Sequence, residues 1–431
     1  MQFNLQNFRY KNTLLFSGLI LALLGVYFNA FFNGFIFDDE TLILNNRYLQ
    51  HWGDWWLFFV SSHSAGGGIA SPFYRPFQLL VYLVLYQING PSPVLYHAFN
   101  VFLHAFNACL VYVLGKRLGF NPVSMFFAAL LWAVHPVHSE AVAYASGTAD
   151  VLYVFFALLG FIILLPDFTK QKILFSLPLF IFALLSKETA VVFPLLATIL
   201  QSLVMRKYFS LKAASRLWPL WCVAILYAVA HMLVPTFSGF ALYNQHNACT
   251  DSLACRIFTY LATLPAYGSL LIWPFHLHPE RSFHSFTQPW HLQVIAGMAI
   301  VALTLWLAVA RRTIDQKRIL TTGILWFLAA GFLSGGILLP VNGVFMEHWL
   351  YLPTIGLFIC LGESVSNIVP RKMGGLALIA VTALTMFWGA RTIEQNATWQ
   401  NAQVFYANIF AIPRFRDYPK KAFDRRFLAD S

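Results

Sequence analysis

Three consecutive carboxylates, Asp38, Asp39 and Glu40, directly follow the first membrane-length apolar run, residues 14–32. Acidic side chains at a membrane surface cost free energy unless they bind a cation, accept a proton or pair with a base. A carboxylate in this place could act as a general base toward a hydroxyl group. Asp38 and Asp39, with Glu40, could also bind a divalent ion such as Mg²⁺ or Mn²⁺ through oxygen. The alternative is a solvated helix end without chemistry.

Polar side chains of the types that catalysis uses recur in four further segments. These segments are Tyr74-Arg75, His135-Pro136-Val137-His138-Ser139-Glu140, Lys187-Glu188 and Glu347-His348-Trp349-Leu350-Tyr351. Imidazole and carboxylate are common zinc ligands, but Pro136 removes the one-face spacing of a helical metal motif. We therefore expect a hydrogen-bonding cluster beneath a substrate pocket in preference to a metal site.

Arg75 and Lys187 are the expected phosphate partners. An arginine can hold a phosphate through a bidentate fork, whereas a lysine acts as a point charge. Lys187 and Glu188 could instead form a self-neutralised ion pair at a tight turn. That turn lies between two short apolar runs, however, so it is expected at depth in the membrane. A charged side chain there costs free energy, which suggests that it has a function.

The composition is that of a polytopic membrane protein. Of 431 residues, 59% are hydrophobic and only 10% are charged, whereas soluble domains carry roughly 25% charged residues. Apolar runs recur from end to end, so no separate soluble domain is expected. The first run lacks a small-residue cleavage site close behind it, and we expect an anchor instead of a signal peptide. The net charge of +11 suits an anionic membrane surface and gives no argument for nucleic acid.

Basic residues cluster in short gaps between the apolar runs, which predicts that these gaps are cytoplasmic loops. This placement gives eleven spans, at about 14–32, 96–115, 121–136, 149–165, 172–186, 190–205, 217–234, 292–310, 319–339, 349–366 and 374–391. The N-terminus is then cytoplasmic and the C-terminus lies outside, although the basic tail at 392–431 conflicts with the charge rule. The runs 76–88 and 256–275 do not fit as spans and are expected at the outer interface. All the polar segments fall on the outer face, which favours an active site there.

The order of these motifs resembles one family. The motifs are Phe37-Asp38-Asp39, Tyr74-Arg75-Pro76, residues 96–104 with His97 and His104, residues 135–143, Leu185-Ser186-Lys187-Glu188 and residues 347–353. From about residue 25 to residue 400, the chain is similar to the transmembrane part of the tetratricopeptide-repeat-containing O-mannosyltransferases and their bacterial relatives. Those enzymes belong to the GT-C glycosyltransferases.

The resemblance implies an all-α GT-C-like domain at 1–391, with its active site in the first outside loop at 33–95, followed by a short basic tail at 392–431. A polyprenyl-phosphate hexose, mannose by resemblance, would donate with inversion to a hydroxyl of a protein or glycan acceptor. Asp38 or Asp39 would be the base, with Asp39 preferred. The implied phosphate contacts are Arg75, Lys187 and His348. The other implied pocket residues are Glu40, Tyr74, His97, His135, His138, Glu140, Glu188, Glu347 and Tyr351.

Two departures from the family limit this transfer. His348 stands where the family has an arginine, which weakens any phosphate contact there. No tetratricopeptide repeats follow the last expected span, so acceptor recognition is expected elsewhere, or the acceptor is not a protein. We expect a bacterial inner membrane with the site facing the periplasm.

Two other classes of protein remain as alternatives. One is a transporter or flippase, which would usually show an internal repeat, and none is evident here. The other is a non-catalytic membrane scaffold. In a separate outside loop, Cys249 and Cys255 are expected to form a disulfide, which an oxidising compartment would permit.

Overall fold

The protein is a bundle of α-helices. The computed structural model describes residues 5–69, 71, 73–204, 211–233, 249, 251–275, 277–279, 283–309, 315–337, 343–369 and 373–410, and these residues contain no strand. The helices are α1 (Leu5–Val26), α2 (Leu57–Val60), α3 (Pro76–Asn89), α4 (Pro93–Arg117), α5 (Pro122–Ala133), α6 (Ser139–Ala143), α7 (Thr148–Leu164), α8 (Lys170–Ser186), α9 (Phe193–Val204), α10 (Leu211–Arg216), α11 (Trp218–Leu233), α13 (Leu253–Ile272), α14 (Leu292–Val309), α15 (Asp315–Phe332), α16 (Pro353–Ile368), α17 (Gly374–Asn396) and α18 (Ala402–Phe410).

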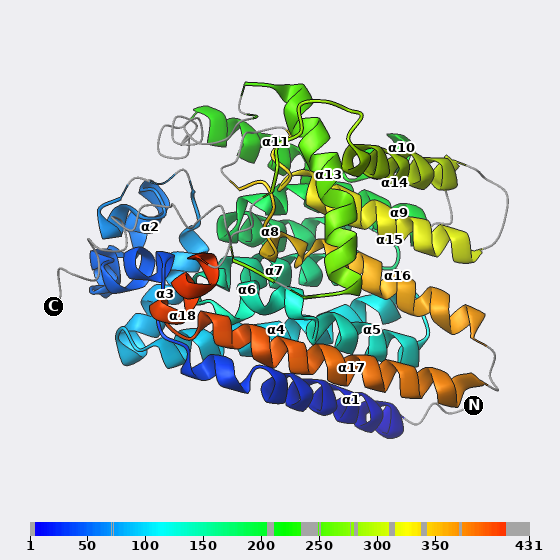
Figure 1. The fold of residues 1–431 in the computed structure, drawn as a ribbon, viewed down its shortest axis with the longest axis horizontal. Helices are drawn as coiled ribbons and strands as arrows, with labels where there is room; N and C mark the ends of the chain where they lie inside the picture. The colour runs from blue at the N-terminus through cyan, green and yellow to red at the C-terminus, as the bar shows by residue number, and fades with distance from the viewer. Residues whose placement is uncertain are drawn as a thin grey trace.

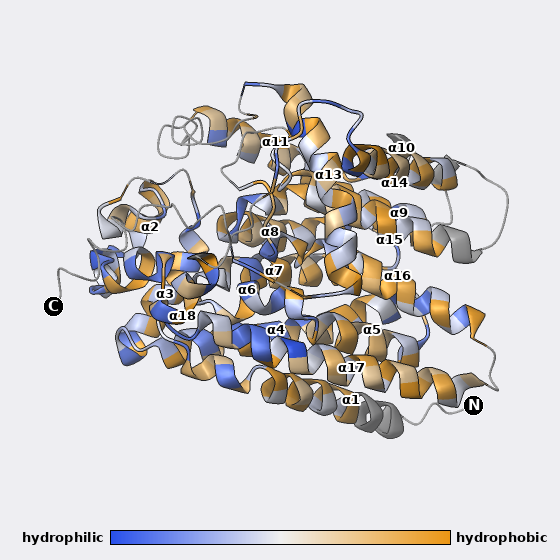
Figure 2. Ribbon diagram, viewed as in Figure 1, coloured by the Kyte–Doolittle hydropathy of each residue, from blue (hydrophilic) through white to orange (hydrophobic). Residues whose placement is uncertain are grey.

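The helices α1 and α17 run side by side along one edge of the bundle, while α2, α3 and α18 gather at one end (Figure 1). Hydrophilic segments concentrate toward that same end, and the long helices are mainly apolar (Figure 2). The end that holds α2, α3 and α18 also holds the Asp38-Asp39 loop. The expectation that all the polar segments lie on the outer face of the membrane stays a prediction.

Prolines and capping side chains mark where many of the helices begin. Proline occupies the first turn of α3, α4, α5 and α16, where its missing N–H costs nothing. Asn121 caps α5 by accepting hydrogen bonds from the backbone N–H groups of Val123 and Ser124. Thr169 and Ser252 cap α8 and α13 in the same way.

A break at Pro136 positions the candidate site. The residue before a proline is biased toward extended backbone, and His135 has φ −73° and ψ 127°. The chain therefore turns between α5 and the α6 segment by 53°. As a result, the chain after Pro136 leaves the direction of α5, and α6 packs against α4, α7 and α17.

Each of the eleven predicted ranges contains a helix, but eleven spans are not confirmed. Four helical segments of the described chain are long and apolar enough to cross a membrane, or five if the bent α5–α6 pair counts as one span. The helix α17 extends to Asn396, past its predicted end at 391. The predicted basic loops at 311–312 and 371–372, and the tail beyond residue 410, lie outside the described residues.

The two predicted interfacial runs are the helices α3 and α13. In Figure 1, α13 is steeply inclined to α1 and α17, but its length and apolar composition would also allow a span. Its interfacial placement therefore stays a prediction. A disulfide joins Cys249 to Cys255 at the start of α13, with a Cα–Cα distance of 5.2 Å.

Glycine allows α13 and α14 to pack closely. A Cβ atom at Gly297 would lie 1.9 Å from the carbonyl oxygen of Leu261. Gly297→Ala should therefore destabilise the protein by about 1–3 kcal/mol through overpacking, which thermal unfolding in detergent would measure. The matched control is Gly18→Ala in α1, where no atom lies within 4 Å of the added carbon. Equal midpoints for Gly297→Ala and wild type would contradict this account of the α13–α14 contact.

Candidate active site

Asp39 is buried and fixes the acidic loop in place. Its Oδ1 accepts hydrogen bonds from the backbone N–H (2.8 Å) and the hydroxyl (2.5 Å) of Ser146, and its Oδ2 accepts one from the N–H of Ile36 (3.1 Å). Burial raises the pKa of Asp39 to about 8, although these hydrogen bonds oppose the shift, and the nearby charge of Asp38 adds to it. Asp39 therefore ties the loop to the segment that follows α6.

Asp38, in contrast, is exposed. Its backbone N–H donates to the hydroxyl of Tyr144 at 3.0 Å. The preceding residue, Phe37, has φ 53°, a left-handed conformation that is strained for a bulky side chain. This turn points neighbouring aspartates in different directions, so the preference for Asp39 as the base does not follow from the structure. Asp38 is the carboxylate that a substrate can reach, and Glu40 beside it is partly buried.

The segment after α17 packs on the acidic loop. The Asn33 amide donates to the carbonyl oxygens of Ala143 and Asn396, and the Gly34 N–H donates to that of Gln400. The Trp399 ring stacks on Tyr144 with centroids 4.9 Å apart, and Phe405 of α18 contacts Phe37 at 5.8 Å. The first part of the predicted tail, up to residue 410, is therefore a wall of the candidate site.

Arg75 is paired with Glu188. Its Nη2 lies 2.6 Å from Oε1 of Glu188 and its Nε lies 3.0 Å from Oε2, in a bidentate fork. The guanidinium also lies over the ring of Phe73, at 4.4 Å from its centroid. The structure thus brings together two predicted site residues from distant segments, but it gives Arg75 a carboxylate partner in place of a phosphate.

Lys187 is paired with Asp150, a residue that the sequence analysis did not select. The Lys187 Nζ lies 2.6 and 2.7 Å from the two Asp150 oxygens, and the two side chains are 4% and 7% exposed. An acid at the start of the apolar run at 149–165 could have been recognised from its cost in a membrane. The alternative of a self-neutralised Lys187–Glu188 pair does not hold, because each of the two side chains pairs with a residue of another segment.

Glu140 holds His348. Its Oε1 lies 2.7 Å from Nδ1 of His348, and its Oε2 accepts the backbone N–H of His348 at 2.9 Å. The neighbouring Glu347 is buried and accepts the backbone N–H of His278 at 2.8 Å. The 135–140 and 347–351 segments are therefore joined by hydrogen bonds, which leave Nε2 of His348 on the far side of its ring.

The other predicted histidines are buried inside the bundle. His135 lies against Trp388 at 4.4 Å, and His138 lies 5.1 Å from both Trp132 and Tyr351. The Tyr351 hydroxyl pairs with Nδ1 of His104 at 2.7 Å. The remaining predicted pocket residues are Tyr74, whose hydroxyl donates to the Phe59 carbonyl oxygen, and His97, which is buried on α4. These side chains pack around the candidate site. None of the contacts described above joins them to the Asp38 carboxylate.

No group of three histidine, cysteine, aspartate or glutamate side chains is placed to hold a metal ion within the described part of the chain. Because Asp39 uses both its oxygens in hydrogen bonds, it fits a coordination site poorly. A divalent ion at Asp38 and Asp39 therefore stays a prediction without geometric support.

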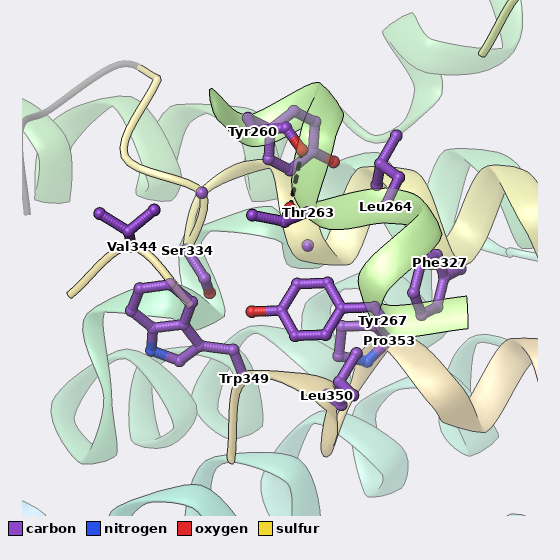
Figure 3. A pocket seen from close by; sticks show the side chains of 12 residues that line it. Tyr260, Thr263, Leu264, Tyr267, Phe327, Ser334, Val344, Trp349, Leu350 and Pro353 are labelled. Carbon is purple, nitrogen blue, oxygen red and sulfur yellow. Dashed lines mark hydrogen bonds between the residues drawn. The ribbon is translucent and has the colours of Figure 1, made fainter. Parts of the chain in front are cut away.

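An apolar pocket opens beside the His348 segment. It lies between α13, α15 and residues 344–353, and its lining includes Tyr260, Tyr267, Phe327, Ser334 and Trp349. In Figure 3 the Tyr267 hydroxyl points toward Trp349 and Ser334. The Tyr267 hydroxyl donates a hydrogen bond to the Met346 carbonyl oxygen at 3.1 Å. The other side chains that line the pocket are mainly apolar. The accessible volume of the pocket is only about 20 Å³, which is room for about one water molecule.

Two side chains near the candidate site could hardly have been selected from the sequence alone. Ser146 holds Asp39, yet it is a single serine in an ordinary Ala-Ser-Gly stretch. His63 lies in the first loop and is only 4% exposed. Burial lowers the pKa of His63 to about 3, and the Arg75 charge lowers it further while Glu188 opposes the shift.

Known proteins provide one comparison. No protein-family model and no solved structure matches the chain. The chain is similar to protein O-mannosyl-transferase F38B6.6 of Caenorhabditis elegans, with 25% identity over 90% of this chain and 57% of that protein. It is also 25% identical to human protein O-mannosyl-transferase TMTC4, over 88% of this chain and 59% of the relative. Mouse protein O-mannosyl-transferase TMTC3 is 23% identical, over 91% and 47%.

The expected resemblance to O-mannosyltransferases is thereby confirmed. The chain spans between 47% and 59% of the length of these three curated relatives. The activity of the whole relatives is therefore a matter for proposal.

The raised pKa of Asp39 predicts a pH-dependent stability. In the unfolded chain this carboxyl ionises near its ordinary pKa of about 3.9, whereas in the folded protein its pKa is about 8. Because the folded state resists ionisation, its stability should fall as the pH rises from about 4 to 8. Asp39→Asn should flatten this part of the curve, as thermal midpoints between pH 5 and pH 8 would show. Parallel curves for the two proteins would contradict the buried environment of Asp39.

The Lys187–Asp150 pair predicts a non-additive double substitution. Lys187→Met leaves a buried aspartate unpaired and should cost about 3–5 kcal/mol. Adding Asp150→Leu removes that charge, so the double variant should be more stable than Lys187→Met alone. Thermal unfolding of both single variants and the double variant would measure this coupling. Additive losses would show that the two side chains act independently.

Proposed function

We propose that the chain is a membrane glycosyltransferase that moves a hexose from a polyprenyl-phosphate donor to an acceptor hydroxyl at the outer face of the membrane. The observation that carries this proposal is the exposed Asp38, held beside a buried Asp39 at the polar end of an apolar bundle. The similarity to named O-mannosyl-transferases supports the class of reaction, a mannose-like sugar and a protein acceptor.

The proposed reaction is a single displacement at the anomeric carbon. Asp38 takes the proton of the acceptor hydroxyl as the acceptor oxygen forms a bond to the anomeric carbon. The bond from that carbon to the phosphate oxygen breaks, and its electron pair leaves with the polyprenyl phosphate. Because the acceptor enters opposite the leaving group, the configuration inverts. Asp39 acts as a positioning residue through Ser146 and Ile36.

The lipid of the donor is proposed to lie against α13 beside the apolar pocket, whose side chains would have to separate to admit a hydrocarbon chain. Tyr260 and Tyr267 of α13 line this pocket. His348 directly precedes Trp349, which lines the pocket, and the His348 side chain is 23% exposed. His348 is one candidate phosphate contact, through its Nε2. Arg75, Lys187 and His348 are each paired with a carboxylate, so each of them would contact phosphate with that partner still attached.

The wider setting is proposed from the expected topology. The N-terminus would be cytoplasmic, and the acidic loop and C-terminal segment would face the periplasm of a bacterial inner membrane. The acceptor would be a protein or a glycan. Any Mg²⁺ or Mn²⁺ would have to bind at Asp38, where the described residues provide few further ligands.

A transfer assay on purified protein in nanodiscs would test the proposal. It would follow release of polyprenyl phosphate from polyprenyl-phosphate hexoses in the presence of a hydroxyl-bearing peptide. Asp38→Asn should lower the rate about 10²–10⁴-fold, as loss of a general base does, without lowering the thermal midpoint. Asp39→Asn should lower the rate less and change the stability as described above.

The matched control is Asp54→Asn, which removes another carboxylate of the same loop in the 3-10 helix Trp52–Trp56. It should leave transfer unchanged. Donor that binds and is never turned over would sink the enzyme proposal and favour a transporter or flippase. Wild-type rates in both Asp38→Asn and Asp39→Asn would favour a scaffold.

A further inference from the structure

Buried polar atoms without a well-formed hydrogen bond among the described residues surround the Arg75–Glu188 pair. These atoms are His63 Nε2, Gln78 Oε1, Thr189 Oγ1 and Tyr227 OH. His63 and Gln78 lie close to each other, and Thr189 lies close to Tyr153, but neither contact has the geometry of a full hydrogen bond. Buried polar groups are nearly always paired, and each exception calls for an explanation such as a bound molecule.

The four side chains come from separate elements that meet at this pair. Thr189 follows Glu188 directly in the chain. His63 of the first loop lies within electrostatic reach of Arg75 and Glu188 and beside Gln78 of α3. Tyr227 of α11 lies within reach of the same ion pair. The α11 helix contacts the 3-10 helix Glu188–Val192, which carries Glu188 and Thr189.

The cluster adjoins the acidic loop. The Gln78 amide donates to the carbonyl oxygen of Ser146 at 2.9 Å, and the Ser146 hydroxyl donates to Asp39. One residue thus separates the cluster from the aspartate that positions Asp38. The ion pair is also reachable, because the Arg75 and Glu188 side chains are 13% and 28% exposed.

The charges favour a neutral ligand over an anion. Arg75 is balanced by Glu188, and the adjacent Lys187 is balanced by Asp150. An arriving anion would have to compete with both carboxylates. A molecule rich in hydroxyl groups can instead donate to the carboxylate and accept from the guanidinium while both remain paired. The unpaired histidine, tyrosine and threonine atoms can each donate or accept, and the glutamine oxygen can accept.

We propose that Arg75, Glu188, His63, Gln78, Thr189 and Tyr227 form the site that binds the hexose ring of the donor. This inference rests on the proposed glycosyltransferase function and names the residues that read the sugar. In this arrangement the ring hydroxyls satisfy the buried polar atoms, and the anomeric carbon lies toward the acidic loop. The residues therefore set which hexose is accepted, while the lipid and phosphate bind elsewhere.

A binding comparison separates sugar recognition from lipid recognition. Affinities of the protein in nanodiscs would be measured for a polyprenyl-phosphate hexose and for polyprenyl phosphate without a sugar. Tyr227→Phe and Thr189→Val each remove one hydroxyl and keep the ion pair. Each should weaken binding of the sugar-bearing donor about tenfold, as loss of one hydrogen bond to a bound ligand does. Binding of polyprenyl phosphate should not change.

The control is Thr385→Val in α17, whose hydroxyl bonds the carbonyl oxygen of its own helix at Val381. It should leave both affinities as in wild type. Affinities would also be measured for a panel of donors that differ in the configuration of one hydroxyl group. Tyr227→Phe should reduce the differences in affinity among these donors. Thermal midpoints would show that each variant is folded.

Each outcome has a separate meaning. If wild type binds and transfers a hexose but the variants keep the same ratio of affinities, the sugar site is wrong and the proposed function stands. The same holds if the variants change only the thermal midpoint, which would assign the unpaired atoms to ordered water. If wild type neither binds nor transfers any of these donors, the proposed function itself fails.

Discussion

The buried carboxylate of Asp39 is the constraint on which the polar end of the molecule depends. A carboxyl group without solvent must have its oxygens satisfied, and the hydrogen bonds from Ser146 and Ile36 do this. The hydrogen bonds from Ser146 join residues 107 positions apart in the chain. The left-handed turn at Phe37 then places Asp38 outward, so one aspartate serves as the anchor while the other is exposed.

The second organising feature is a set of three charge pairs, each of which joins side chains from different segments of the chain. Arg75 with Glu188, Lys187 with Asp150 and Glu140 with His348 connect the first loop, α6, α7, the α8–α9 turn and the segment before α16. Removing one member of a buried pair is far more costly than replacing both. The pairs therefore hold the helix ends in register, and they also neutralise the cations that a phosphate would otherwise attract.

These pairs suggest a division of labour along the proposed donor. In the proposed mode of binding, the hydrocarbon chain would lie beside the apolar pocket between α13 and α15, the phosphate near the exposed His348 ring, and the sugar at the neutral cluster of polar groups. Such a division is physically reasonable because the three parts of the donor differ in charge and polarity.

The sequence by itself determined the helices and the kind of face they share. Apolar runs of membrane length, prolines in first turns and capping residues act over a few neighbouring positions, so eleven predicted ranges each contain a helix. The candidate residues could be gathered on one face from the same patterns and from the order of the motifs. The disulfide partners, Cys249 and Cys255, are also near neighbours in sequence.

Only the tertiary structure decided which charges pair and which aspartate is exposed. Asp38 and Asp39 are adjacent and chemically identical, and their difference arises from Ser146, Tyr144 and the turn at Phe37. Arg75 meets Glu188 across 113 positions of sequence. Contacts of this kind depend on how whole helices pack, and no local pattern of residues encodes them.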